Sequence, residues 1–170
     1  MDFLELAKKR CSVREFKTDK VSDEIIDKII KAGCIAPTAC NNQPFKILVI
    51  KTKEALDKIK KCTECHFNAP IVFVVCYDKN LCWKRPFDQK TSGDIDASIV
   101  ATHMILEACD LGVGSTWVMF FKADILKQEF ELPDYLEPVA LLPMGYPVEG
   151  YMPSATHTKY REFEELVDIK

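Results

Sequence analysis

The chain has 170 residues, of which 48% are hydrophobic and 29% are charged, and its net charge is −3 at pH 7. This length suits one domain with its own core, and the composition is typical of a globular protein rather than a disordered one. A nucleic-acid partner is not favoured, because proteins that bind polyanions usually carry a basic surplus. No apolar run approaches the roughly 20 residues of a membrane span. We therefore expect a single domain over residues 1–170, with neither nucleic acid nor a membrane as partner.

The N-terminus and the cysteines indicate the cellular compartment. Residues 1–5 read Met-Asp-Phe-Leu-Glu, with neither a basic start nor an apolar stretch, so no signal peptide is predicted. Eight cysteines in a chain without an export signal favour a reducing environment, and we expect a cytoplasmic protein. Cys34, Cys76 and Cys109 stand in apolar runs, where we expect them to act as small buried hydrophobic side chains.

The first helices and the longest one have clear signals in the sequence. Residues 2–10 can form a short helix. Residues 22–36 carry isoleucines at helical spacing on one face, and Ser22 is a good N-cap. Residues 94–111 are apolar around most of a helix circumference, which predicts burial in a core or in a subunit interface. Gly112 then supplies the C-terminal stop.

Short apolar runs predict the strands. Residues 47–50, 71–76 and 139–142 are continuous apolar segments, and residues 116–121 are rich in β-branched and aromatic side chains. Continuous runs are typical of strands buried on both faces, so helices are expected on both sides of the sheet. With a helix between the first two strands and a small one after Asp124, the order predicts an α+β or mixed α/β fold whose sheet is sandwiched between helices.

Two basic clusters lie at opposite ends of the chain, Arg10-Cys11-Ser12-Val13-Arg14 and Lys159-Tyr160-Arg161. Cations spread this way are costly to hold together unless they converge on an anion, so a phosphate-bearing ligand is the leading hypothesis. The chain has no Gly-rich dinucleotide fingerprint and no P-loop, so side chains would have to hold the phosphate through charge-assisted hydrogen bonds. The alternative interpretation is that these are solvated surface charges.

Four motifs resemble those of the FMN-dependent nitroreductase family. Residues 10–16, Arg-Cys-Ser-Val-Arg-Glu-Phe, resemble its N-terminal Arg-x-Ser-x-Arg/Lys-x-Phe signature. Residues 36–45, Ala-Pro-Thr-Ala-Cys-Asn-Asn-Gln-Pro-Phe, are similar to its Ala-Pro-Ser-x-x-Asn-x-Gln-Pro-Trp loop, with Phe45 where the family has Trp. Residues 112–117 resemble its Gly-x-Gly turn after a long central helix, and residues 159–161 resemble its C-terminal basic pair. The motifs occur in the family's order and span nearly the whole chain.

The resemblance implies a fold, a cofactor and a reaction. The fold would be α+β, a three-layer α/β/α sandwich around a mixed, mainly antiparallel sheet. The assembly would be an interlocked homodimer with exchanged C-terminal tails and two FMN sites at the subunit interface. NADH or NADPH would pass a hydride to FMN, and a small electron acceptor such as a nitroaromatic or a quinone would then enter the same pocket, which gives ping-pong kinetics.

The resemblance also assigns roles to the basic residues. Arg10, Ser12 and Arg161 would hold the FMN phosphate, with Lys159 beside them. Arg14 would face the pyrimidine edge of the flavin and tune its reduction, because reduced flavin is an anion. No catalytic acid or nucleophile is obligatory, since the flavin performs the hydride transfer. No metal site is expected.

Further contacts to the flavin are implied for the two other motifs. The loop residues expected to reach the flavin from the other subunit are Pro37, Thr38, Ala39 and Asn41. The backbone amides expected beside the reactive ring nitrogen are those of Met119 and Phe120. The remaining residues expected to line the cofactor site are Cys11, Gly114 and Ser115.

Two groups of metal-binding residue types have alternative interpretations. Residues 62–66, Cys-Thr-Glu-Cys-His, match a haem-attachment pattern and half of a zinc or iron–sulfur site, whereas structural or solvent-facing thiols are the default. His103 shares a helix face with Asp96, Glu107 and Asp110, and a polar helix face is favoured there over a metal site.

Three other features leave alternatives open. Residues 78–93, with Trp83, Arg85 and Phe87, would form either a lid over the flavin or a local mini-core. Cys40 is either redox-sensitive or a packing residue. The aromatic tail after residue 147 should pack on another surface, for which a partner subunit is the candidate.

Two alternative functions stay open. One is a same-fold flavoenzyme with a specific substrate, such as a dehalogenase or a dehydrogenase. The other is a non-enzymatic flavin or thiol redox sensor.

Overall fold

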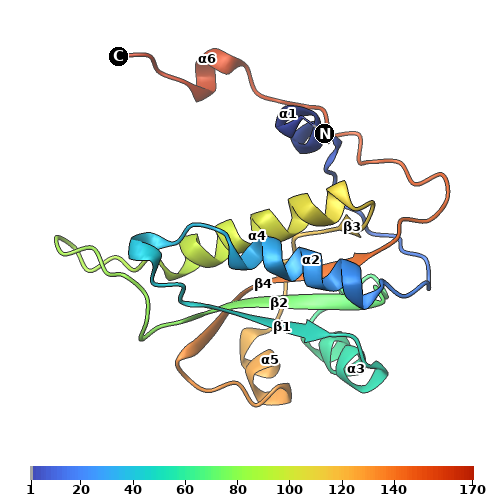
Figure 1. The fold of residues 1–170 in the computed structure, drawn as a ribbon, viewed down its shortest axis with the longest axis horizontal. Helices are drawn as coiled ribbons and strands as arrows, with labels where there is room; N and C mark the ends of the chain where they lie inside the picture. The colour runs from blue at the N-terminus through green and yellow to red at the C-terminus, as the bar shows by residue number, and fades with distance from the viewer. Residues whose placement is uncertain (1) are drawn as a thin grey trace.

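The computed structural model describes residues 2–170. Its elements in chain order are α1 (Phe3–Lys9), α2 (Asp23–Cys34), the 3-10 turn η1 (Ala39–Asn41), β1 (Phe45–Ile50), α3 (Lys53–Cys62), β2 (Ile71–Asp78), α4 (Gly93–Asp110), β3 (Gly114–Ser115), α5 (Ala123–Glu129), β4 (Leu136–Gly145) and α6 (Phe163–Leu166). The sheet forms a central layer, with α2 and α4 on one face and α3 and α5 on the other (Figure 1). The predicted α+β sandwich is confirmed.

The sheet has the strand order β1-β2-β4-β3, and its three neighbouring pairs are all antiparallel. Within residues 2–170, the one parallel pairing is an isolated bridge between Ser12 and Ser115. β2 and β4 lie in the centre and are buried along almost their whole length. β1 is only half-buried, because it is an edge strand and has a neighbour on one side alone. The prediction that the strands are buried on both faces is therefore confirmed for β2 and β4. It is wrong for β1.

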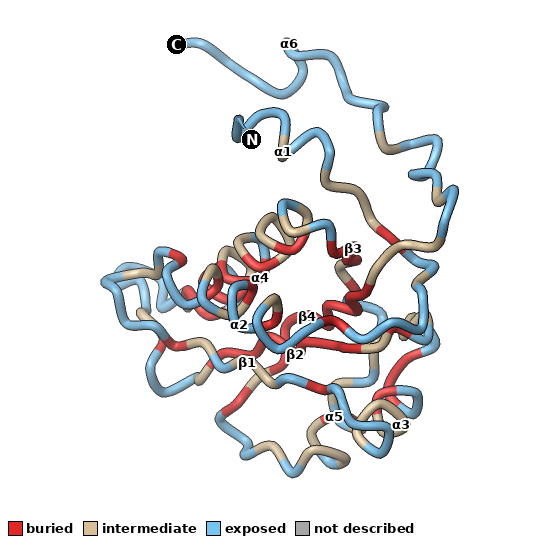
Figure 2. Tube along the Cα trace, turned by 45° about the vertical axis from the view of Figure 1, so that its right-hand side comes forward, coloured by how far each residue is buried: buried red, intermediate tan, exposed pale blue. Residues whose placement is uncertain are grey.

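The core divides into two clusters, one on each face of the sheet. Alternate residues of β2 supply both: Phe73 and Val75 pack with α2 and α4, whereas Val72 and Val74 pack with α3 and α5. Figure 2 shows the buried residues concentrated in the strands and on the inner sides of the helices. The alternation follows from the two-residue period of a strand, and it explains the unbroken apolar run, since both faces need apolar side chains.

The predicted strand over residues 116–121 is wrong, because β3 has only two residues and the chain then leaves the sheet. Thr116 donates its N–H to the carbonyl of Pro143 at 3.2 Å, but a proline has no N–H with which to continue the ladder. One further bridge joins Val118 to Leu141 through two hydrogen bonds of 2.9 and 3.0 Å. Beyond it, Met119 and Phe120 turn outward and are exposed.

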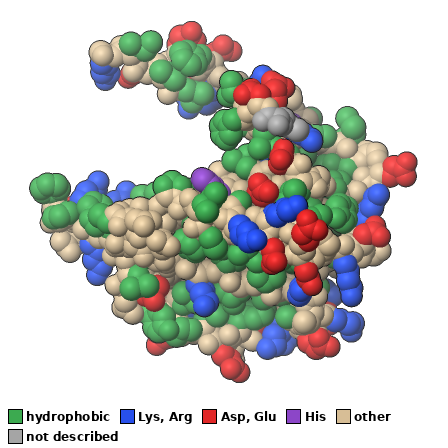
Figure 3. All heavy atoms as spheres, viewed as in Figure 1, with side chains coloured by type: hydrophobic (Ala, Val, Ile, Leu, Met, Phe, Trp, Pro, Cys, Tyr) green, Lys and Arg blue, Asp and Glu red, His purple; other side chains and the backbone are tan. Residues whose placement is uncertain are grey.

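The end of the C-terminal tail, with α6, stands away from the body of the molecule. Figure 3 shows the segment with α6 standing clear of the body on the side of α4, with hydrophobic side chains on its surface. The exposed apolar residues of this segment are Met152, Tyr160, Phe163, Leu166, Val167 and Ile169. Within residues 2–170, no helix combines the length and the apolar character that a bilayer crossing requires.

Candidate functional site

The N-terminal basic segment is fixed against the edge of the sheet. Arg10 caps the C-terminus of α1, where its N–H donates to the carbonyl of Leu6. The chain then runs beside β3, and Val13 donates its N–H to the carbonyl of Ser115 at 2.9 Å. Val13 is buried, whereas Arg14 is exposed, as the alternation of an extended segment requires. The backbone of this segment is therefore held in place. Of its two arginines, Arg14 is exposed and Arg10 is partly exposed.

The second basic cluster reaches the same end of the molecule through the tail. Tyr151 donates its hydroxyl to the carbonyl of Ser12 at 2.6 Å, and the Nε2 atom of His157 lies 3.0 Å from the carbonyl oxygen of Lys8. The segment that carries Lys159 and Arg161 therefore lies beside the segment that carries Arg10, although about 150 residues separate them in sequence. The Arg161 guanidinium contacts Glu165 at 3.1 Å and remains mostly exposed.

A small cavity of about 130 Å³ opens between α1, β3 and the end of α4. Its lining includes four of the predicted cofactor residues, namely Arg10, Cys11, Gly114 and Ser115. A β-carbon on Gly114 would lie 2.8 to 3.0 Å from side-chain atoms of Val13, so glycine is what lets the basic segment approach the sheet this closely. Burial raises the pKa of the Cys109 thiol at the cavity wall, although the charge of Lys9 opposes this.

The loop between α2 and β1 has an unusual backbone. Cys40, Asn41 and Gln43 have φ angles of 52°, 54° and 49°, in the left-handed region. Asparagine tolerates this region, but the other two residue types are strained there. Within the loop, Gln43 donates its N–H to Thr38 Oγ1 at 3.0 Å, and Asn41 donates its N–H to the carbonyl of Thr38 at 3.0 Å. The predicted residues Pro37, Thr38, Ala39 and Asn41 thus form one tightly turned unit.

Within one chain, this loop and the basic segment lie at opposite ends of α4. Asp96, in the first turn of α4, accepts a hydrogen bond from the N–H of Ala39, whereas Gly114 and Ser115 follow the last turn. The distance from Asp96 to Asp110 along the helix axis is about 21 Å, at about 1.5 Å per residue. The structure therefore does not bring residues 37–41 to Arg10 and Ser12 of the same chain.

Met119 and Phe120 lie at a third position, on a groove of about 490 Å³. The other wall of this groove comes from residues 60–64 at the end of α3. The hydroxyl of Thr63 donates to the carbonyl of Phe120, and the N–H of Lys122 donates to the carbonyl of Cys62 at 2.9 Å. These bonds orient the backbone of the outward turn while both of its large side chains remain exposed.

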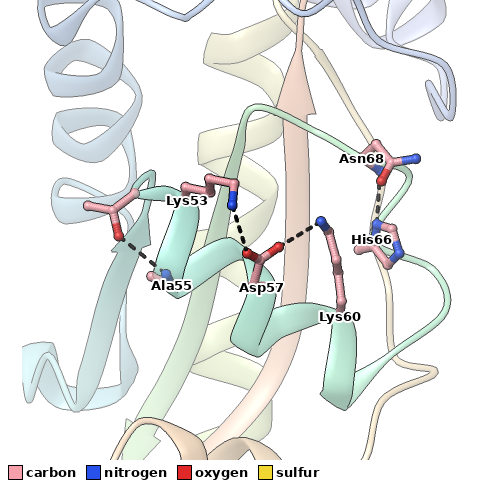
Figure 4. Close-up of polar contacts among 7 residues, drawn as sticks. Lys53, Ala55, Asp57, Lys60, His66 and Asn68 are labelled. Carbon is pink, nitrogen blue, oxygen red and sulfur yellow. Dashed lines mark hydrogen bonds and ion pairs between the residues drawn. The ribbon is translucent and has the colours of Figure 1, made fainter.

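The Cys62-x-x-Cys65-His66 motif forms the turn between α3 and β2. Cys65 donates its N–H to Thr63 Oγ1 at 2.9 Å, and His66 Nδ1 accepts the N–H of Asn68 at 3.0 Å. Figure 4 shows the contact between His66 and Asn68 beside α3. Burial raises the pKa of the Cys62 thiol and lowers the pKa of His66. Among the described residues, no group of three or more metal-binding side chains gathers here or elsewhere.

The other cysteines divide between core and surface. Cys76 lies in β2, and its burial raises the pKa of the thiol to about 12. Cys34 was predicted to be buried but is exposed, because the buried stripe of α2 runs through Ile26, Ile29 and Gly33. Cys109 is only partly buried. Cys40 is exposed in the strained loop of the single chain, and its two alternative roles, redox-sensitive or packing, both stay predictions.

Residues 79–92 form an arm whose outer part projects from the body, visible as the green hairpin in Figure 1, whereas Cys82 and Ser92 at its base are buried. Lys84 pairs with Thr91 across it, and the Arg85 guanidinium binds both carboxylate oxygens of Asp88. Phe87 is 94% exposed, so this aromatic residue does not belong to a local mini-core. The lid over the flavin stays a prediction.

Asp96 was predicted to share a polar helix face with His103, and this is wrong. The side chain of Asp96 is buried and binds Ala39 and Ser92, whereas His103 is partly exposed beside the apolar groove on α4. Asp96, Tyr151 and Thr63 are the polar residues at the site that sequence reasoning missed. Each of these residues forms a hydrogen bond to a residue far away in the sequence. No local sequence pattern predicts such a contact.

Three comparisons relate this chain to known proteins. A model of the nitroreductase family matches residues 7–70 and 66–146. A protein of Methanothermobacter thermautotrophicus that carries the name NADH dehydrogenase/NAD(P)H nitroreductase is 31% identical, over 88% of this chain and 80% of its own length. An NADPH-dependent oxidoreductase of Staphylococcus haemolyticus is 29% identical, and the match covers 85% of this chain but only 64% of that protein.

Solved structures share the fold over almost the whole chain. A nitroreductase family protein from Clostridium difficile has a TM-score of 0.93 and 43% identity, with 99% of this chain and 98% of that chain covered. A nitroreductase in complex with FMN from Exiguobacterium sibiricum has a TM-score of 0.84 over 100% of this chain and 98% of that chain. Its identity is 22%, so this second likeness concerns the fold alone.

Proposed function

This chain belongs to the nitroreductase family, and we propose that it is an FMN-dependent oxidoreductase that accepts a hydride from NADH or NADPH and reduces a small acceptor such as a nitroaromatic or a quinone. The names of its relatives, NAD(P)H nitroreductase and NADPH-dependent oxidoreductase, support the reaction class. The FMN in the structure of a protein with the same fold supports the cofactor.

The observation that carries the proposal is that the two basic segments lie side by side at one end of the molecule. Within residues 2–170, neither Arg10 nor Arg14 forms an ion pair with a carboxylate. Arg10 lines the small cavity and lies close to the second basic segment, and a guanidinium group without an anionic partner at such a place is suited to a phosphate. Arg10, Ser12, Lys159 and Arg161 would hold the phosphate group of FMN.

We propose that two copies of the chain are needed to complete each site. The loop of residues 37–41 and the basic segment lie at opposite ends of α4, so the loop can contribute to a cofactor site only across a subunit interface. The exposed face of α4 has an apolar groove of about 520 Å³ whose lining includes Phe3, Ile95, Ile99 and Leu106. An apolar face of this kind, together with the exposed apolar tail, fits an interlocked homodimer.

Bound FMN would supply the hydride chemistry, and the protein would supply binding, orientation and electrostatics. The exposed guanidinium of Arg14 would lie at the pyrimidine edge, where it stabilises negative charge on the ring. The backbone amides of Met119 and Phe120 would lie beside the reactive nitrogen, in a turn held by Thr63.

The experiment that tests this function is a two-substrate velocity study of the FMN-loaded protein. NADH is varied at several fixed concentrations of p-benzoquinone, and the measurement is repeated with NADPH. Because donor and acceptor would use one pocket in turn, double-reciprocal plots are expected to give parallel lines. Intersecting lines would contradict the shared pocket, and no oxidation of either nicotinamide would contradict the enzyme assignment.

The role of Arg14 gives a separate prediction. Replacing Arg14 with Met removes the positive charge and keeps much of the side-chain length, so the flavin midpoint potential is expected to become more negative. The potential is measured by dye-coupled reductive titration of the loaded protein. Lys17→Met, which removes another exposed cation three residues away, is the control and should leave the potential close to that of the unaltered protein. An unchanged potential in the Arg14→Met variant would remove this assignment.

A further inference from the structure

A buried carboxylate holds the strained loop from the side opposite to its exposed surface. Asp96 is 2% exposed. Its Oδ1 atom accepts the N–H of Ala39 at 2.9 Å, and its Oδ2 atom accepts the hydroxyl of Ser92 at 2.7 Å. Both carboxylate oxygens therefore have a donor, one from the loop and one from the end of the arm.

Burial of a carboxylate is costly, so its presence here calls for compensation. Two hydrogen bonds to the charged group provide part of it, and the position in the first turn of α4 provides more, since the helix dipole favours a negative charge there. Ser92 precedes α4 as its N-cap, but its hydroxyl does not cap the helix and instead donates to Asp96. The first turn of α4 is thus arranged around this carboxylate.

The loop needs such an anchor because its own backbone is strained. Cys40 and Gln43 are non-glycine residues with positive φ, a strained conformation that persists only when its surroundings enforce it. Besides the bonds to Thr38 and the bond from the N–H of Asp78 to the carbonyl of Pro44 at 2.6 Å, two contacts tie the loop to the rest of the molecule. Ala39 binds Asp96, and the side-chain amide of Asn42 donates to the carbonyl of Leu81 in the arm at 3.1 Å. The bond between Ala39 and Asp96 is the less exposed of these two contacts.

We propose that Asp96 is a positioning residue for cofactor binding: it fixes the backbone of residues 38–41 in the conformation that meets the flavin across the subunit interface. The inference rests on the proposed function, and Asp96 itself does not touch the flavin. Because the same carboxylate also binds Ser92, it joins the cofactor loop to the base of the arm. Removing the carboxylate releases the loop from its strained conformation, and FMN then has to bind a mobile loop.

The test compares Asp96→Ala, Asp96→Asn and the control Glu54→Ala, which alters an exposed acidic residue in the first turn of α3, on the other face of the sheet. The Asn side chain can still accept from Ala39 through its oxygen and donate to Ser92 through its NH2 group. The FMN dissociation constant is measured by quenching of flavin fluorescence, and hydrogen exchange of residues 36–45 is measured without FMN. Asp96→Ala is expected to weaken FMN binding at least fivefold and to speed exchange of the loop at least tenfold. The other two variants should remain within twofold in both measurements.

The two measurements distinguish failure of this inference from failure of the proposed function. If the unaltered protein binds no FMN, the proposed function fails, and the inference fails with it. If the unaltered protein binds FMN and Asp96→Ala binds it equally well, the positioning role is wrong, whatever happens to thermal stability. Should Asp96→Ala not fold, Asp96→Ser keeps a polar group that is too short to reach Ala39, and the same fivefold loss is expected of it. Weak binding in Asp96→Asn as well would indicate a requirement for charge and would overturn the hydrogen-bond argument.

Discussion

Replacing Arg10 with Ala is expected to weaken FMN binding by about ten- to a hundredfold. Hydrogen bonds to charged groups contribute about 1.5–3 kcal/mol each, and a tenfold change in affinity corresponds to about 1.4 kcal/mol. Arg10 is partly buried at the end of α1, lines the small cavity beside Gly114 and Ser115, and has a backbone held by Leu6. Its backbone is therefore fixed in advance of binding, so only the side chain has to be ordered when the phosphate binds.

Two further variants separate a specific phosphate contact from a general effect of charge. Lys28→Ala changes the net charge equally but acts on the exposed face of α2, where Lys28 pairs with Glu24, and it should leave FMN affinity within twofold. Arg10→Lys keeps the charge and loses the forked geometry of the guanidinium. Its affinity for FMN should therefore lie between that of Arg10→Ala and that of the unaltered protein. Titrations at 50 and 300 mM salt complete the measurement. Equal affinity in Arg10→Ala and the unaltered protein would exclude Arg10 from the phosphate site.

Replacing Gly114 with Ala should lower the free energy of unfolding by about 1–3 kcal/mol, the usual cost of overpacking a well-packed region. The new β-carbon would lie 2.8 and 3.0 Å from the two γ-carbons of Val13 and 2.9 Å from its β-carbon. The basic segment would have to move away from β3, so FMN binding should weaken as well. Urea unfolding of the cofactor-free protein gives the stability, and flavin quenching gives the affinity.

A double-mutant cycle with Val13→Ala tests the cause of this loss. Val13→Ala removes the two γ-carbons and so relieves two of the three close contacts. The double variant should be more stable than the sum of the single effects predicts, by about 0.5–1.5 kcal/mol. Gly112→Ala is the matched control: its β-carbon would meet open space, and its cost would come from a φ angle of +76°. Coupling between positions 112 and 13 as large as that between 114 and 13 would contradict the packing explanation.

The sequence predicted best what depends on neighbours along the chain. Ser22 caps α2 by accepting the N–H of Ile25, as its residue type and position indicated. The runs of residues 71–76 and 139–142 became the two central strands, because an unbroken apolar run needs a helix layer on each face. Gly112 follows α4 with a positive φ angle, as a helix stop requires.

The errors concern contacts between segments far apart in sequence. The strand at residues 116–121 has the right composition, but the proline at position 143 of its neighbour interrupts the ladder. Asp96 is separated from Ala39 by 57 residues, so its helical spacing from His103 could not reveal that it is buried. Cys34 stands in an apolar stretch of sequence but lies on the exposed side of α2.

Part of the predicted cofactor site lies together within one chain, and the resemblance had assigned the remaining loop to the other subunit. The motifs at residues 10–16 and 112–117 do lie together, because the N-terminal segment runs along β3. The loop at residues 36–45 lies at the far end of α4, and only a second copy of the chain would bring it to the basic segment. Order along a sequence does not reveal which of its segments meet within a chain and which would meet between chains.

The most direct measurement of the central claim is the visible absorption spectrum of the purified protein after loading with FMN and desalting. We expect a retained flavin band near roughly 450 nm, with one FMN per chain, because the cations beside the small cavity would hold the phosphate. The band should weaken strongly in Arg10→Ala and persist in Lys28→Ala. A colourless protein after desalting would mean that the two basic segments do not form a phosphate site, and it would contradict the proposed function.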